Sequence, residues 1–163
     1  MQIYIIIETS LLLREYSTPS LEKNEPTLIS EEYVCIVKAG YSDRIEELKK
    51  NVVKFKKEAV DEINFHLVSE SANFDNTILV YDLKEYGNSS ILEQIQISHE
   101  SVETIIPTHF DPLETTKEKR TFSIHRNKIL NTGESEYGIH FGVFNYDFTP
   151  QGFFELRLNF LIE

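Results

Sequence analysis

The chain has 163 residues, of which 40% are hydrophobic, 12% aromatic and 26% charged. This length suits one domain, residues 1–163, that buries a core without disulfides, and the composition excludes a disordered chain. No apolar run approaches the ~20 residues that cross a bilayer, and the N-terminus lacks the basic and cleavable parts of a secretory signal. We therefore expect a cytoplasmic protein without membrane contact.

The negative charge is concentrated in one segment. The formal net charge is −11, and residues 58–116 contain twelve Asp or Glu against one basic residue, Lys84. The rest of the chain is neutral as a set. Concentrated charge steers association with a partner of opposite sign, and an acidic protein is poorly suited to bind a nucleic-acid backbone directly. The charge therefore favours a basic protein partner.

Two strands are predicted in the first forty residues, at 3–8 and 33–38, because both runs are rich in β-branched and aromatic residues. Residues 11–13 are read as an extension of the first strand. The Pro- and Ser-containing segment 17–30 is typical of a loop. The single cysteine, Cys35, lies in an apolar run and is expected to be a buried, inert thiol.

The next segment predicts a long helix over residues 43–63. Asp43 and Glu46 have the spacing of a capping box. Apolar residues then recur at steps of three and four, as on one face of a helix. These residues are Ile45, Leu48, Val52, Phe55, Ala59 and Ile63.

Short extended segments follow the predicted helix. We expect strands at 65–69, 77–83 and 95–106, the last with a break near Ser98, and a long loop over 107–119. Residues 121–130 are read as a further antiparallel strand beside the C-terminal hairpin.

The C-terminal third predicts that hairpin, with arms at 137–148 and 154–162. A turn at Pro150 and Gln151 would place Phe141 opposite Phe160, with the apolar faces of both arms on one side. The other side would display His140, Phe144, Tyr146 and Phe148 beside Glu155, Arg157 and Asn159.

Together these elements predict an α+β fold. It consists of a mostly antiparallel sheet of six to eight strands with one long amphipathic helix, about 43–63, packed on one face.

No spacing in the chain forms a strong catalytic motif. The sequence contains neither a nucleophile elbow nor a glycine-rich nucleotide loop, and the histidines offer pairs where a transition metal needs three or four ligands. We therefore predict no catalytic residue, no metal and no cofactor, and expect the protein not to be an enzyme.

The leading functional prediction is a non-enzymatic inhibitor or immunity-type protein of a bacterium or phage, which neutralises a basic target such as a nuclease toxin or a nucleic-acid-binding protein. Acidic residues would steer the association, and an aromatic and an arginine would anchor it. The predicted contact residues are Glu70, Asp75, Asp82, Glu85, Glu93, Glu100, Glu103, Tyr146 and Arg157.

Two alternatives stay open. One is a small enzyme or small-ligand module that uses some of His99, His109, His125 and His140 in a pocket on the sheet. The other is a homo-oligomeric structural protein, in which the C-terminal hairpin forms an interface between copies.

Overall fold

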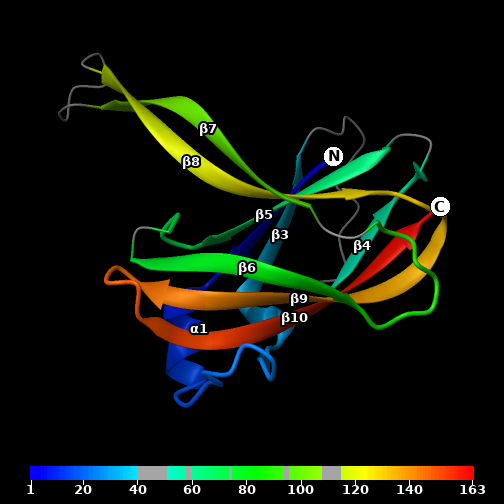
Figure 1. Cartoon of the computed structure of the whole chain (residues 1–163), viewed down its shortest axis with the longest axis horizontal. Helices are drawn as coiled ribbons and strands as arrows, with labels where there is room; N and C mark the ends of the chain where they lie inside the picture. The colour runs from blue at the N-terminus through cyan, green and yellow to red at the C-terminus, as the bar shows by residue number, and fades with distance from the viewer. Residues whose placement is uncertain (40–50, 58–59, 74, 94–95, 108–114) are drawn as a thin grey trace.

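In the residues that the structure describes, the chain folds as two five-stranded β-sheets packed face to face, with one short α-helix (Figure 1). The computed structural model describes residues 1–39, 51–57, 60–73, 75–93, 96–107 and 115–163, with the side chains of 38–39, 99–100, 102, 104–107 and 120–123 outside that description. Within the described residues, no helix is long and apolar enough to cross a membrane.

Sheet A has the strand order β3-β1-β5-β8-β7. Its strands are β1 (Gln2–Ile7), β3 (Val34–Ala39), β5 (Glu62–Ser69), β7 (Gln96–Pro107) and β8 (Thr115–Lys128). β1 and β5 run parallel, whereas the other neighbours are antiparallel. After β1 the chain enters helix α1 (Thr9–Glu15), which buries Leu12.

Sheet B has the order β2-β10-β9-β6, and β4 also pairs with β10. Its strands are β2 (Thr27–Leu28), β4 (Val52–Phe55), β6 (Asn76–Glu85), β9 (Gly133–Asn145) and β10 (Pro150–Ile162). The short strands β2 and β4 run parallel to β10, and the long strands β6, β9 and β10 form an antiparallel meander. A 3-10 turn, η1 (Glu31–Tyr33), leads from β2 into β3.

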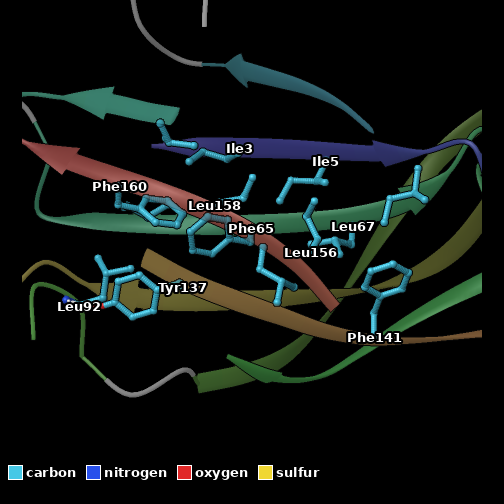
Figure 2. Packing of buried hydrophobic residues seen from close by; sticks show 14 of the residues in the cluster. Ile3, Ile5, Phe65, Leu67, Leu92, Tyr137, Phe141, Leu156, Leu158 and Phe160 are labelled. Carbon is cyan, nitrogen blue, oxygen red and sulfur yellow. Dashed lines mark hydrogen bonds between the residues drawn. The ribbon is translucent and has the colours of Figure 1, made fainter. Parts of the chain in front are cut away.

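The core lies between the inner faces of the two sheets (Figure 2). Alternate residues of β1 and β5, including Ile3, Ile5 and Phe65, point from sheet A toward Phe160 and Tyr137 of sheet B. The Phe160 ring meets both Phe65 and Tyr137 edge-on, with ring centroids 5.6 Å apart in each case. Edge-on aromatic contacts of this kind add to the free energy of apolar burial.

β7 and β8 form a hairpin that extends beyond the body of the sandwich (Figure 1). β8 pairs with β5 over residues 125–128 alone, while its pairing with β7 continues to Thr115. The distal half of the hairpin is therefore a two-stranded arm. The predicted break near Ser98 is absent from the register of this pairing, and the predicted loop over 107–119 overlaps the ends of both strands.

The predicted α+β fold with a helix over 43–63 is wrong. Residues 52–55 form β4 and residues 62–69 form β5, so the described parts of that range are strands and the short segments beside them, and its first turns lie outside the described residues. Val53 and Phe55 are buried on either side of exposed Lys54. The apparent helical spacing therefore arises from separate short runs with a period of two.

Residues 11–13 are also not strand, because they form the middle of α1. Cys35 is exposed rather than buried, since it lies on the outer side of the edge strand β3. The predicted third strand of the hairpin belongs to the other sheet: 121–128 is part of β8 in sheet A, where His125 and Asn127 face inward and Lys128 outward.

The C-terminal hairpin exists, but its register differs from the prediction. Phe141 lies opposite Phe154 rather than Phe160. The turn comes earlier, at residues 146–149, because Asn145 and Asp147 supply the hydrogen bonds that close it. The displacement is an even number of residues, so the predicted inner and outer faces are preserved.

Candidate functional site

A row of polar and charged side chains crosses the outer face of sheet B. Asp82 on β6, His140 on β9 and Glu155 on β10 lie side by side, since β9 residue 140 is paired with both neighbours. His140 Nδ1 is 3.5 Å from Asp82 Oδ2, and His140 Nε2 is 4.0 Å from Glu155 Oε2. Arg157 Nε donates a hydrogen bond of 2.8 Å to Glu155 Oε1. We call these four residues the polar row.

The centre of the polar row is buried although it lies on an outer face. Glu155 is 6% exposed and His140 8%. Tyr81 covers His140, with ring centroids 5.9 Å apart, and its hydroxyl donates to the Lys23 carbonyl at 2.8 Å. At the other end the Arg157 guanidinium lies 4.3 Å from the centre of the Tyr86 ring.

Glu155 remains ionised despite its burial. Burial by itself would raise the pKa of this carboxyl, but hydrogen bonds from Tyr86 and Arg157, with the charge of Arg157, hold the pKa below its ordinary value. The same carboxylate raises the pKa of the Arg157 guanidinium. The two groups therefore form a stable ion pair.

A glycine makes room for this arrangement. A Cβ on Gly138 would lie 2.6 Å from Glu155 Oε1 and 2.7 Å from Tyr86 Cε2. The polar row is thus closely packed, with its hydrogen-bonding groups turned toward one another. Such an arrangement holds β6, β9 and β10 in register and is a poor design for binding a substrate.

The outer face of sheet A has the opposite character, because the outward positions of β1, of β3 up to Val37 and of β5 from Asn64 onward carry no Asp, Glu, Lys or Arg. Glu62, at the start of β5, lies just outside this uncharged region. We define this neutral face by its members, which are Gln2, Tyr4, Ile6, Cys35, Val37, Asn64, His66 and Val68. Val37 is 42% exposed and Tyr4 is 37% exposed. The Tyr4 ring stacks on His66 at 4.7 Å, and His66 Nε2 donates to Gln2 Oε1 at 2.6 Å.

The two ends of the neutral face differ in charge. Beyond Ile6 and Cys35 lies a hollow whose lining includes Glu8, Glu32 and Glu70. At the other end Asn64 lies opposite Arg126 of β8, and Glu62 lies opposite Lys128. The neutral face is therefore acidic at one border, and at the other it has two basic residues and one acidic residue.

The turn between β9 and β10 presents two aromatic side chains to solvent. Tyr146 is 84% exposed and Phe148 is 87% exposed. Phe148 has a φ of 65°, a left-handed conformation that is costly for a bulky residue. We call residues 146–148 the aromatic turn.

The aromatic turn is held rigid by its own polar side chains. Asn145 Oδ1 accepts from Asp147 N at 3.3 Å and from Thr149 N at 3.0 Å. Asp147 Oδ1 accepts from Thr149 N at 3.0 Å as well, and bonding to Thr149 lowers the pKa of Asp147.

The acidic residues that were predicted to contact a partner have separate structural roles. Glu70 caps α1 by accepting from Thr9 N at 2.7 Å and from Ser10 N at 2.9 Å. Glu85 Oε1 accepts from Ser90 N and from Ser135 Oγ, both at 2.8 Å. The Glu70 carboxylate therefore stabilises the N-terminal end of α1, and the Glu85 carboxylate stabilises the local turn that contains Ser90.

The remaining predicted contacts are also dispersed. Asp75 is exposed in the turn before β6, Glu93 follows an isolated bridge, and Glu103 lies on the β7 arm 3.5 Å from Lys117. Glu100 is on β7, with its side chain outside the described residues. Tyr146 is in the aromatic turn. Among the predicted contacts whose side chains are described, the structure places Asp82 and Arg157 in the same cluster, the polar row, and their predicted role in steering a partner stays a prediction.

The histidines of the enzyme alternative do not converge where they are described. His125 is inside, between the sheets, where it lines a narrow apolar space with Phe65 and Ile139. His140 is on the outer side of sheet B. The His99 side chain and His109 lie outside the described residues. Within the described part of the chain, no three His, Cys, Asp or Glu residues gather as metal ligands would.

Sequence reasoning missed the neutral face. The strand predicted at 3–8 comes without an assignment of inner and outer faces, so the outward positions of Tyr4 and Ile6 are not recognised. A usable signal was present, because the outward positions of β1, of β3 up to Val37 and of β5 from Asn64 onward contain no Asp, Glu, Lys or Arg. The aromatic turn also had a signal, since Asn and Asp two residues apart favour turns.

Comparison with known proteins gives two findings. A family model described as "PixA: Inclusion body protein" matches residues 1–162. Among solved structures, the crystal structure of an inclusion body protein of that kind from Burkholderia cenocepacia J2315 has a TM-score of 0.83 and 16% sequence identity, and the match covers 99% of this chain and 94% of that chain. No curated protein matches the sequence.

These findings correct the leading functional prediction. The description of the matching family is that of an inclusion body protein. Nothing in either match points to an immunity protein or an inhibitor. The error came from treating the acidic segment as one binding surface, whereas several of its carboxylates serve turns, a helix end and the polar row.

Proposed function

Because this chain belongs to the PixA inclusion body protein family, we propose that it is a structural protein that acts by associating with copies of itself. The proposal develops the homo-oligomeric alternative raised by the sequence. One observation carries it: the neutral face, an exposed sheet surface without charge in a protein whose net charge is −11.

Electrostatics explains why that observation matters. Copies with a charge of −11 repel one another, so association needs a place where the facing surfaces bring no further carboxylates together. The neutral face meets this need and adds the apolar surface of Ile6, Val37 and the Tyr4 ring. Exposed apolar patches on a sheet are typical of protein contacts.

The proposal is tested by the concentration and salt dependence of the protein's size. Sedimentation velocity from micromolar to millimolar protein should show species larger than one chain, and their share should rise with salt, because salt screens the repulsion between acidic copies. A protein that stays monomeric over this whole range, at low and at high salt, contradicts the proposal.

A substitution in the neutral face makes the test specific. Val37→Glu places a carboxylate on the neutral face, on the edge strand β3 opposite Tyr4, and should shift association to higher concentration. Leu79→Glu is the matched control, because Leu79 is also an exposed strand residue, 48% against 42%, but belongs to sheet B. Circular dichroism and thermal melting of both variants check that each is folded.

A further inference from the structure

We infer that the contact between copies is head to tail: the aromatic turn of one copy docks on the neutral face of the next. This inference rests on the proposed function and names the surfaces that carry it. Both surfaces are described above, one at the end of the β9–β10 hairpin of sheet B and the other on the outer side of sheet A.

The aromatic turn has the properties of a preformed anchor. Tyr146 and Phe148 are the most exposed of the large hydrophobic side chains in the described chain, at 84% and 87%. The hydrogen bonds of Asn145 and Asp147 fix the backbone beneath them. A rigid anchor loses little conformational freedom on binding. The left-handed Phe148, which glycine would satisfy at lower cost, keeps a ring exposed at that position.

The neutral face has the matching chemistry. Tyr and Phe rings need an apolar surface with aromatic edges or faces, which the Tyr4–His66 stack and Val37 supply. The ionised group of the turn is Asp147. At the border where Arg126 and Lys128 outnumber Glu62, the net positive charge attracts this carboxylate, and the acidic hollow near Glu8 repels it, so the charges also select an orientation.

A symmetric contact fits these surfaces less well. Two aromatic turns placed tip to tip would bring the Asp147 carboxylates of both copies together. Because the turn and the neutral face are different surfaces, a contact between two copies leaves one copy with a free face and the other with a free turn. Contacts of this kind are heterologous, and they extend into open chains when the rotation between copies does not close a ring. That property suits a protein that accumulates in a large body.

A mixing experiment tests the pairing directly. The turn variant Tyr146→Ser/Phe148→Gly keeps an intact face, and the face variant Val37→Glu keeps an intact turn. Each variant alone should associate only at about tenfold higher concentration than the unmodified protein, the loss expected for a truncated or blocked anchor. Mixed in equal amounts, they should form a one-to-one dimer that grows no further.

Cross-linking gives a second, independent readout, because the chain has one cysteine and Cys35 is exposed on the neutral face. With a short bismaleimide, Thr149→Cys, which adds an exposed thiol beside the aromatic turn and keeps both rings, should give a ladder of dimers, trimers and longer species. The unmodified protein and Cys35→Ser/Thr149→Cys should give none, because each has a thiol at one of the two surfaces only.

The outcomes separate the inference from the proposal beneath it. A monomeric unmodified protein overturns the proposed function. Association of the unmodified protein with equal association of the turn variant leaves the proposed function standing and overturns the head-to-tail contact. A Cys35 dimer cross-linked in the unmodified protein, with no ladder in Thr149→Cys, indicates a symmetric face-to-face pair and overturns it too.

Discussion

Arg157 Nε donates a hydrogen bond of 2.8 Å to Glu155 Oε1, two residues away on the same strand. Both side chains lie on the outer face of sheet B, and 8% of the Glu155 side chain is exposed against 39% of the Arg157 side chain. The arginine therefore lies between the buried carboxylate and water. Loss of Arg157 and loss of Glu155 should therefore have different consequences for stability.

Arg157→Met should lower the free energy of unfolding by about 1–3 kcal/mol, because it leaves an ionised carboxylate without its cation in a nearly dry position. Adding Glu155→Gln should recover part of that loss. Urea denaturation of the single and double variants measures the coupling. Arg14→Met is the control, since Arg14 and Glu15 pair at 3.4 Å with both side chains at least half exposed; a loss equal to that of Arg157→Met would contradict the expectation.

Glu70→Gln should destabilise the protein by about 1 kcal/mol at neutral pH, the usual worth of a helix cap at a solvent-exposed position. Burial opposes the ionisation of Glu70, but hydrogen bonds from Ser10 and Thr9 prevail and lower its pKa to about 2. A lowered pKa stabilises the fold above the ordinary value of 4.5, and this contribution is lost as the pH falls from there toward about 2.

Thermal melting between pH 7 and pH 2 should therefore show a shallower acid loss for Glu70→Gln than for the unmodified protein. Glu8→Gln is the matched control, because Glu8 occupies the N-cap position of α1 without a side-chain hydrogen bond to it. Parallel pH profiles for the unmodified protein and Glu70→Gln would show that the cap contributes nothing.

Phe160→Ala should cost about 3–5 kcal/mol, because the ring is fully buried and contacts both Phe65 and Tyr137. Leu28→Ala, at a site that is 50% exposed, should change stability by less than about 1 kcal/mol. Chemical denaturation of both variants tests whether the sheets share the core seen in Figure 2; similar small losses would speak against it.

Phe148→Gly should be more stable than Phe148→Ala by about 1 kcal/mol. Both variants remove the exposed ring, but only glycine adopts a φ of 65° without strain. Thermal melts at low protein concentration, where association does not contribute, measure the difference. An alanine variant as stable as the glycine variant would mean that the turn relaxes.

The strands with regular alternation were predictable from sequence, and the connections between them were not. Five strands lie close to their predicted positions, namely β1, β3, β5, β6 and β10. Apolar residues that alternate over five or more positions are compatible with few structures other than a strand. The segment around Val52 and Ile63 was wrongly predicted as a helix, because short apolar runs fit both the helical period of 3.6 residues and the strand period of two. These residues form strands because they pair with β10 and β1, which are distant in sequence.

The residues of the polar row could be predicted from the sequence, but their structural role could not. The outward display of His140 beside Glu155 and Arg157 followed from alternation alone, and the structure confirms it. The burial of that row was not predictable, because it depends on Tyr81 reaching across sheet B to Lys23. Nor could net charge reveal that Glu70 and Glu85 are engaged by backbone and hydroxyl donors.

The arm of β7 and β8 implies a graded local stability within one domain. Near the body, residues 125–128 belong to a sheet with neighbours on both sides, whereas toward Thr115 each strand has a single partner. Two-stranded ribbons are marginal in water by themselves. Amide hydrogen exchange in the arm should therefore proceed through openings that leave the sandwich intact, becoming slower toward residue 125.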